Sequence, residues 1–239
     1  MESVTFLAMT ATEIGNIRPL PPKLAWMACH FSPYGTGLTN LPRELPSGSL
    51  LILNDRIPIC GHDPQRIQAQ LEEALETCSC TGLLLDFQRP DSPETARLVR
   101  QLCEGLRCPL AVSEGYVKEA AAPVFLPPLP HHIPLAEYMA PWKDREIWLE
   151  VAMDAETITL TEAGASVSSS SLPEVQEEGF AEEKLHCHYH TKLTETAAEF
   201  TLWRTAEDIK DLLAEAEQLG IQTTVGLYQE LRGVHSSML

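Results

Sequence analysis

Short apolar runs alternate with helix-like patterns along most of this chain, and this alternation limits the fold more than any other feature. Ser49–Asn54 is a continuous apolar run of the kind that a parallel sheet buries on both faces. A helical pattern begins after Asp63, and a second apolar run, Leu83–Phe87, follows it. Alternation of this kind is typical of parallel strands joined by crossover helices. We therefore predict an α/β fold built on a parallel sheet.

Capping residues mark the starts of three helices. Asp63 stands before Pro64 and Ser92 before Pro93, so each pair offers an N-cap followed by proline at the first helical position. Nearer the C-terminus, Thr205 has the spacing of a capping pair with an aspartate three residues later. These signals predict where three of the crossover helices begin.

Eight segments are candidates for strands, which is the number that a (β/α)8 barrel requires. They are centred on Trp26, Leu51, Leu84, Ala111, Phe125, Leu149, His188 and Val225. Several connecting helices are missing from the pattern, so we predict a reduced or distorted TIM-type barrel. We also expect antiparallel hairpin additions, Trp148–Met153 with Thr157–Thr161 and His186–Leu193 with Glu199–Trp203. Such a barrel would use residues 1–239 as a single domain, with residues 1–23 as an N-terminal extension.

The charge balance bears on the partners of the chain. Its 34 acidic and 17 basic residues give a formal net charge of -17, which repels phosphate backbones and anionic lipid surfaces. No apolar stretch approaches the roughly 18 to 20 residues that span a bilayer. We expect neither a nucleic-acid partner nor a membrane.

The cysteines and the start of the chain bear on location. The seven cysteines are an odd number scattered through apolar patterns, which favours reduced thiols over a disulfide framework. No basic region precedes an apolar run at the start, so we expect no secretion signal. These features together favour a soluble, cytoplasmic protein.

Polar residues that directly follow the apolar runs are the candidates for a functional site, because barrels carry their chemistry at the carboxyl ends of the strands. These residues are His30, Tyr34, Asp55, Arg56, Asp86, Gln88, Arg89, Glu114, Tyr116, Glu150, Tyr228, Gln229 and Glu230.

Two of these strand ends carry a family resemblance. The segment Gly82–Pro90, GLLLDFQRP, resembles the fourth-strand motif of family 18 glycoside hydrolases, whose chitinase-type pattern is D-x-x-D-x-D-x-E followed by one residue and proline. The segment Val225–Leu231 is similar to the last strand of that family, which usually carries an aromatic residue at the floor of the sugar pocket. The resemblance covers two short motifs and the strand order. It implies a barrel that holds an oligosaccharide or a small polar ligand.

The resemblance assigns roles to individual positions. The last aspartate of the motif falls on Asp86, the catalytic glutamate on Gln88, the preceding aspartate on Leu84 and the floor tryptophan on Tyr228. In that family the glutamate protonates the leaving oxygen, and a glutamine has no acidic proton to donate. The resemblance therefore implies a sugar-binding protein or a catalytically degenerate glycoside hydrolase homologue. The substrate-binding residues we expect are Gln88, Arg89, Asp55, Tyr34, Tyr116, Tyr228 and Gln229.

Two alternatives stay open, and the sequence does not decide whether the protein is an enzyme. An active glycosidase would pair Asp86 with Glu114 or Glu230, since glycosidases need two carboxyl groups about 5 to 9.5 Å apart.

A metal-dependent hydrolase would instead use His186, His188 and His190, because strand alternation places the three rings on one face. No E-x-x-H or C-x-x-C partner accompanies these histidines, so we expect no metal and no other cofactor. The sequence gives no oligomeric state.

Overall fold

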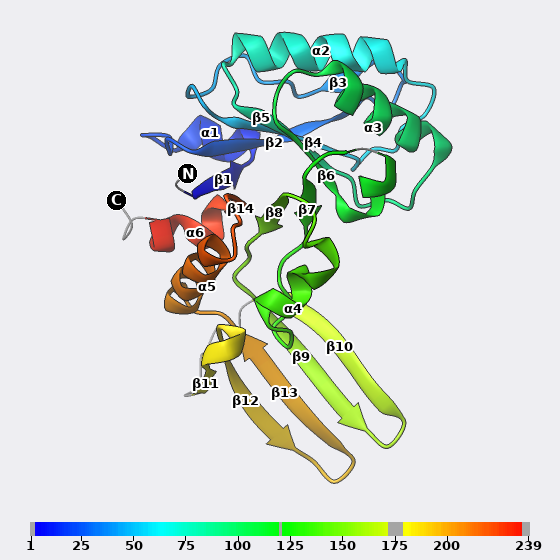
Figure 1. The fold of residues 1–239 in the computed structure, drawn as a ribbon. Helices are drawn as coiled ribbons and strands as arrows, with labels where there is room; N and C mark the ends of the chain where they lie inside the picture. Colours follow the sequence, from blue (N-terminus) through cyan, green and yellow to red (C-terminus); the bar gives the residue numbers. More distant parts are fainter. Residues whose placement is uncertain (1–2, 120, 172–178, 236–239) are drawn as a thin grey trace. The chain divides into compact units, whose positions relative to one another are not determined.

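The computed structural model describes residues 3–119, 121–171 and 179–235 and divides the chain into two compact units (Figure 1). The first unit consists of Met1–Pro127, Asp144–Glu150 and Gln222–Tyr228. The second consists of Pro128–Lys143, Val151–Ile221 and Gln229–Leu239. Each unit is described by itself below.

The first unit is a closed barrel of eight parallel strands. Its sheet closes because β1 pairs with β14 on one side and with β2 on the other. The strands, in their order around the barrel, are β1 (Val4–Met9), β2 (Leu24–Phe31), β4 (Leu50–Asn54), β5 (Gly82–Asp86), β6 (Leu110–Ser113), β7 (Val124–Leu126), β8 (Ile147–Glu150) and β14 (Thr223–Leu227). The short strand β3 (Leu38–Thr39) adds to β2 in the antiparallel sense. The predicted TIM-type barrel is confirmed.

Alternating apolar side chains build the barrel on both of its faces. In β4, Leu50 and Ile52 belong to the cluster that fills the interior, while Leu51 and Leu53 are also fully buried. Because successive side chains of a strand point to opposite faces, Leu51 and Leu53 face outward, toward the covering helices. This two-sided burial explains why the strand is a continuous apolar run.

Two of the covering helices begin where the sequence predicts. α2 (Pro64–Thr77) has Asp63 as its N-cap, and α3 (Pro93–Gly105) has Ser92. The Asp63 carboxylate accepts the N–H of Gln65 at 3.0 Å, which satisfies one of the free donors at the start of α2. Figure 1 shows α2 and α3 side by side on the outside of the barrel.

Three other connections of the barrel carry less helix, as the expectation of a reduced barrel implies. A six-residue helix, α1 (Ala11–Asn16), follows β1, and a 3₁₀ segment, η1 (Glu114–Glu119), follows β6. Among the described residues, no helix joins β2 to β4. α6 (Tyr228–His235) begins directly after β14.

The second unit contains a five-stranded antiparallel sheet in the order β10-β9-β13-β12-β11 (Figure 1). Its strands are β9 (Asp154–Thr161), β10 (Gly164–Ser171), β11 (Phe180–Glu182), β12 (Cys187–Leu193) and β13 (Ala197–Trp203). Its helices are α4 (Leu135–Met139), η2 (Ala140–Trp142), η3 (Glu183–Leu185) and α5 (Ala206–Gln218). Thr205 and Asp208 form the predicted capping box at the start of α5.

Two details of the predicted fold are wrong. The barrel strand expected at His188 belongs instead to the antiparallel sheet, and the eighth parallel strand is β1, which lies inside the expected N-terminal extension. The expected hairpin Trp148–Met153 with Thr157–Thr161 does not form, because β8 is a parallel barrel strand and β9 pairs with β10. The second expected hairpin is confirmed as β12 with β13.

None of the helices in the described ranges has the length and apolar character needed to cross a membrane.

Candidate functional site

A cavity of about 670 Å³ opens in the first unit at the carboxyl ends of the barrel strands. Seven of the eight barrel strands or the loops directly after them contribute to its wall; for β5 these are Leu84, Asp86, Gln88 and Arg89. Chemistry in this fold sits at that end of the strands, so the cavity is the candidate functional site of the first unit.

The polar residues of the cavity follow from strand periodicity. Three of them stand two positions after an apolar residue that fills the barrel interior, so they point to the same side of their strands. The pairs are Ile52 and Asn54, Leu84 and Asp86, and Trp148 and Glu150. Ile52 and Leu84 line the cavity from the barrel interior, and the three polar residues form part of its wall.

Asp86 is an acid of this wall whose pKa is shifted by its surroundings. Burial raises the pKa of its carboxyl, and the negative charge of Asp55 adds to that rise, while a hydrogen bond from Gln88 opposes it. In that bond the Gln88 side-chain amide donates to Asp86 Oδ1 at 3.2 Å. The cavity therefore presents a carboxyl and an amide side by side, which together can accept from and donate to a polar ligand.

Asp55 also lines the cavity, but its carboxylate is used within the protein. Oδ1 accepts the backbone N–H of Gln88 at 3.0 Å, and Oδ2 accepts the backbone N–H of Arg89 at 2.8 Å. The Asp55 residue is only 5% exposed. It holds the loop after β5 in place.

Arg89 and Tyr116 brace the same loop. The Arg89 guanidinium donates from Nε to the Asp55 carbonyl at 2.7 Å and from its terminal nitrogen to the Arg56 carbonyl at 2.9 Å. The buried Tyr116 hydroxyl donates to the Arg89 carbonyl at 3.0 Å. Both side chains, which were expected to bind substrate, contact the protein in this structure.

The remaining expected site residues of the first unit lie outside the cavity wall. Tyr34 is 85% exposed on the loop after β2, and Glu114 is exposed at the start of η1. Tyr228, at the start of α6, is half-buried. Gln229 belongs to the second unit, where it is exposed. The acid that shares the cavity with Asp86 and Asp55 is Glu150.

Glu230 belongs to the second unit. There its Oε2 accepts the backbone N–H of Met153 at 2.8 Å, and burial raises its pKa while that bond opposes the rise. The expected pairing of Glu230 with Asp86 stays a prediction.

Several cavity residues were missed by the sequence reasoning. Thr10, Asn40 and Asn54 line the cavity, although none was singled out. Asn54 has a signal that could have found it, since it ends its strand two residues after an inward-facing apolar side chain, as the predicted Glu150 does. Asn40 carries no such signal, because it lies on the loop after the short antiparallel strand β3.

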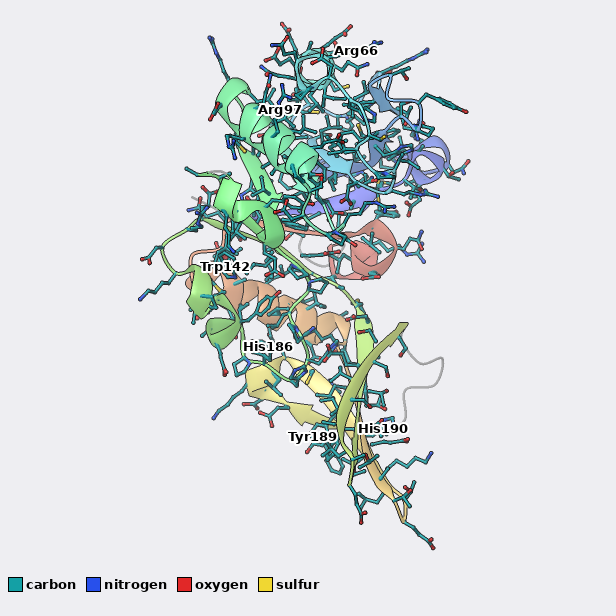
Figure 2. The ribbon with its side chains drawn as sticks, turned by 90° about the vertical axis from the view of Figure 1, so that its right-hand side faces the viewer. Arg66, Arg97, Trp142, His186, Tyr189 and His190 are labelled. Carbon is teal, nitrogen blue, oxygen red and sulfur yellow. The ribbon has the colours of Figure 1, made fainter. Side chains whose placement is uncertain are left out.

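The expected histidine cluster does not assemble. His186 adopts a left-handed backbone before β12 and contacts Glu215 of α5, whereas His188 Nδ1 lies 2.8 Å from Asp208 Oδ2. His190 packs against Trp203, and Figure 2 shows it farther along the strand than His186. Within the described part of the chain, no group of three or more His, Cys, Asp or Glu side chains could hold a metal ion. The metal-hydrolase alternative is not favoured.

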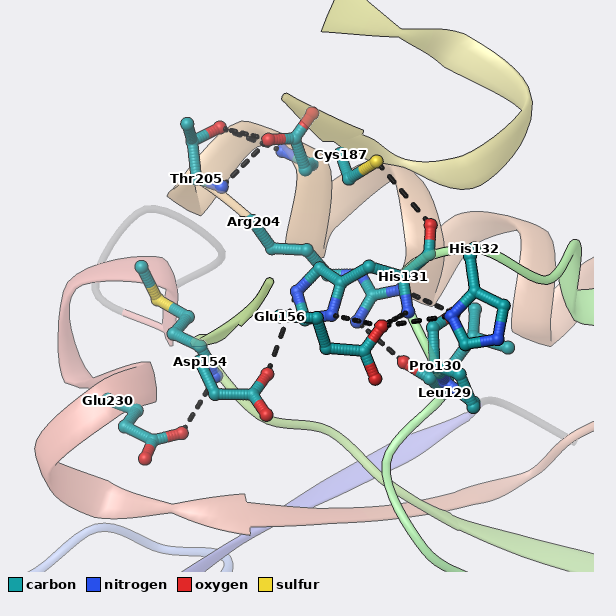
Figure 3. Close-up of polar contacts among 12 residues, drawn as sticks. Leu129, Pro130, His131, His132, Asp154, Glu156, Cys187, Arg204, Thr205 and Glu230 are labelled. Atoms are coloured by element: carbon teal, nitrogen blue, oxygen red, sulfur yellow. Dashed lines mark hydrogen bonds and ion pairs between the residues drawn. The ribbon is translucent and has the colours of Figure 1, made fainter. Parts of the chain in front are cut away.

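The second unit contains a buried polar cluster that the sequence did not reveal (Figure 3). Glu156 Oε2 accepts the backbone N–H of His131 at 3.0 Å and lies 3.1 Å from Nδ1 of His132. Arg204, which is 1% exposed, donates to the carbonyls of Leu129 and Pro130 at 2.7 and 3.4 Å. The two side chains fasten the segment 129–132 to the antiparallel sheet.

Burial and these contacts act in opposite directions on Glu156. Burial would raise the pKa of its carboxyl, but the contacts with the two histidine rings and the His131 N–H outweigh burial and lower the pKa to about 2. Burial lowers the pKa of Arg204.

Comparison by sequence finds neither a matching protein-family model nor a matching curated protein.

Comparison by structure finds similar barrels. A class V chitinase from Nicotiana tobaccum is 9% identical with a TM-score of 0.62, and the match covers 94% of this chain and 93% of the chitinase. A mutant of that chitinase in complex with NAG4 matches with the same TM-score and identity.

A chitinase-like agglutinin from Robinia pseudoacacia is 12% identical with a TM-score of 0.59, covering 92% of this chain and 93% of the agglutinin. The spore cortex-lytic enzyme SleL of Bacillus cereus is 11% identical with a TM-score of 0.57, covering 94% of this chain and 70% of SleL. The chain therefore has the fold of the chitinase-type barrels, as the resemblance in its sequence implied.

Proposed function

We propose that this protein binds an oligosaccharide in the barrel cavity and does not hydrolyse it. The observation that carries this proposal is the wall at the end of β5, where Asp86 and Gln88 stand together in a cavity of about 670 Å³. A pocket of this size at the carboxyl ends of barrel strands is a typical ligand site. The likeness to chitinases, one of them in complex with NAG4, supports a chitin-type oligosaccharide as the first ligand to test.

The chemistry of the wall suits a sugar. The carboxyl groups of Asp86 and Glu150 offer oxygen acceptors for hydroxyl groups, and the Gln88 amide offers a donor. The Asn54 side chain lines the same wall, but it also donates to the Met27 carbonyl at 3.0 Å and accepts the Arg56 N–H at 3.2 Å. Apolar side chains below them, among them Leu84 and Phe125, give the ring carbons an apolar contact surface.

In this proposal, Gln88 is the reason that the protein does not hydrolyse the bound sugar. Gln88 takes the place that the resemblance gives to the catalytic glutamate, and an amide cannot protonate a leaving oxygen. Asp55, another acid of the wall, already accepts two backbone N–H groups.

Isothermal titration with a tetramer of N-acetylglucosamine tests the binding. We expect wild type to bind and Asp86→Asn to lose at least about tenfold in affinity, because a hydrogen bond to a charged group contributes about 1.5 to 3 kcal/mol. The control is Glu73→Gln, an exposed carboxylate-to-amide change on α2, which should leave the affinity unchanged. Equal affinities of wild type and Asp86→Asn would refute the assigned site.

A panel of aryl glycosides tests the absence of turnover. We expect no release of the aryl group by wild type. Hydrolysis that Asp86→Asn abolishes would instead make the protein an active glycosidase.

A further inference from the structure

Side chains at or just after the ends of neighbouring barrel strands hold the backbone of the loop after β5 by hydrogen bonds. The N–H of Phe87 donates to Ser113 Oγ at 2.9 Å, and the N–H groups of Gln88 and Arg89 donate to the Asp55 carboxylate. The carbonyl of Arg89 accepts the hydroxyl of Tyr116. The loop that presents Gln88 to the cavity is therefore fixed by three neighbouring side chains.

Asp55 has the central part in this arrangement. Its two carboxylate oxygens accept two consecutive N–H groups, one each, at 3.0 and 2.8 Å, and the negative charge strengthens both bonds. In return, Arg89 Nε donates to the Asp55 carbonyl at 2.7 Å. The loops after β4 and β5 are thus bonded to each other in both directions.

Two consecutive backbone N–H groups that point the same way can bind an anion. The N–H groups of Gln88 and Arg89 form such a pair, and the buried Asp55 carboxylate is the anion that they bind. A ligand in the cavity therefore meets the Gln88 side chain and not the backbone N–H groups behind it.

We propose that Asp55 is a positioning residue of the sugar site, which fixes the backbone of Gln88 and so holds the Gln88 amide against Asp86. The inference rests on the proposed function for the identity of the ligand, but the positioning itself does not depend on it. Asp55 acts on the ligand through Gln88, because both of its carboxylate oxygens are bonded to the backbone of the loop.

The Asp55 charge also acts on Asp86, whose pKa burial raises first and Asp55 raises further. The other charged or titratable side chains of the cavity wall are His30, Arg56, Arg89 and Glu150. Removal of the Asp55 charge alone would lower the pKa of Asp86, whereas release of the Gln88 amide, the larger of the two contributions, would raise it. The positioning role therefore predicts a net rise in the pKa of Asp86 in an Asp55 variant, which the side-chain carboxyl carbon of Asp86 reports in an NMR titration, and a fall would contradict it.

Hydrogen exchange of the Gln88 and Arg89 amides tests the positioning without any sugar. Asp55→Asn keeps one acceptor oxygen and Asp55→Ala keeps none, so we expect faster exchange in both variants and the larger change in Asp55→Ala. A lost charge-assisted hydrogen bond corresponds to about a tenfold to hundredfold acceleration. The control is Asp63→Asn, which keeps a good N-cap on α2 and should leave the two amides unchanged.

Titration with the N-acetylglucosamine tetramer then tests the consequence for the ligand. We expect weaker binding by Asp55→Asn and Asp55→Ala, and recovery in Asp55→Ala when formate, but not chloride at equal ionic strength, refills the carboxylate position. If Asp55→Ala does not fold, Asp55→Asn alone decides the amide exchange.

Wild-type exchange rates of Gln88 and Arg89 in a folded Asp55 variant would overturn the positioning role. So would wild-type affinity in both variants. If wild type binds no sugar, the proposed function fails, while amide exchange and the Asp86 titration still decide the role of Asp55.

Discussion

Replacement of Glu156 by glutamine should destabilise the second unit in a way that depends on pH. Glu156 has a side chain only 12% exposed, and its pKa is lowered from 4.5 to about 2 by the contacts that overcome its burial. The difference is about 2.5 pKa units, and one unit corresponds to about 1.36 kcal/mol, so the charged carboxylate contributes about 3 kcal/mol.

The direction with pH follows from the lowered pKa. A carboxyl that is more acidic in the folded state stabilises that state fully above its unfolded pKa, here 4.5, and the contribution is lost as pH falls toward about 2. Urea unfolding at pH 7, 5, 4, 3 and 2 should therefore give a difference between wild type and Glu156→Gln of about 3 kcal/mol at pH 7 that shrinks below pH 4.5.

Two features of the assay keep this result interpretable. Because the chain has two compact units, unfolding need not be a single transition, so hydrogen exchange of β9 and β13 should accompany the urea curves. The matched control is Glu162→Gln, an exposed change next to β9 that should have no effect at any pH. A difference as large at pH 2 as at pH 7, or none at pH 7, would refute the role given to the Glu156 charge.

Three further outcomes are expected. Gly82→Ala should lower the melting temperature, because the added Cβ would lie 2.9 Å from the backbone oxygen of Pro109 and force β5 and β6 apart, at a cost of about 1 to 3 kcal/mol. The control is Gly15→Ala, whose Cβ would meet no atom within 4 Å and should leave the melting temperature unchanged. Asp63→Ala should cost about 1 kcal/mol in urea unfolding through loss of the α2 cap, and an unchanged midpoint would contradict that reading. Elemental analysis of protein without an affinity tag should find no stoichiometric zinc in wild type. Zinc that is present in wild type and lost in His188→Gln would instead support a metal site at the histidines.

The parts of the fold that could be predicted from the sequence depend on residues that lie close together in the chain. The strand at Leu50–Asn54 is buried on both faces and is therefore continuously apolar, and the caps Asp63 and Ser92 lie within a few residues of the N–H groups they satisfy. Strand β1 has the same local cause, since Phe6–Met9 are all buried, but the run lies in the predicted N-terminal extension and so is not among the predicted strands. The alternating polar and apolar residues around His188 predict a barrel strand, but they form β12 of the antiparallel sheet.

Part of the candidate site could be predicted from the sequence for the same reason. Asp86 continues the inward-facing side of β5 after Leu84, so its place in the cavity follows from a period of two. Glu114 does not follow from this rule, because Ser113 occupies the inward position on β6 and Glu114 begins a 3₁₀ segment. The use of Asp55 inside the protein depends on two loops that are far apart in the sequence, and no local pattern reports such a contact.

The pairing of β14 between β1 and β8 has a consequence for how the barrel forms. Thr5 and Thr224 are 219 residues apart in the chain, yet their hydroxyls are hydrogen-bonded at 2.9 Å. During synthesis the first seven barrel strands emerge before β14, so β1 and β8 wait as open edges while the whole antiparallel sheet is made. Such long-range closure slows folding and leaves strand edges available to other chains. The last barrel strand to leave the ribosome is thus the one that removes both edges at once.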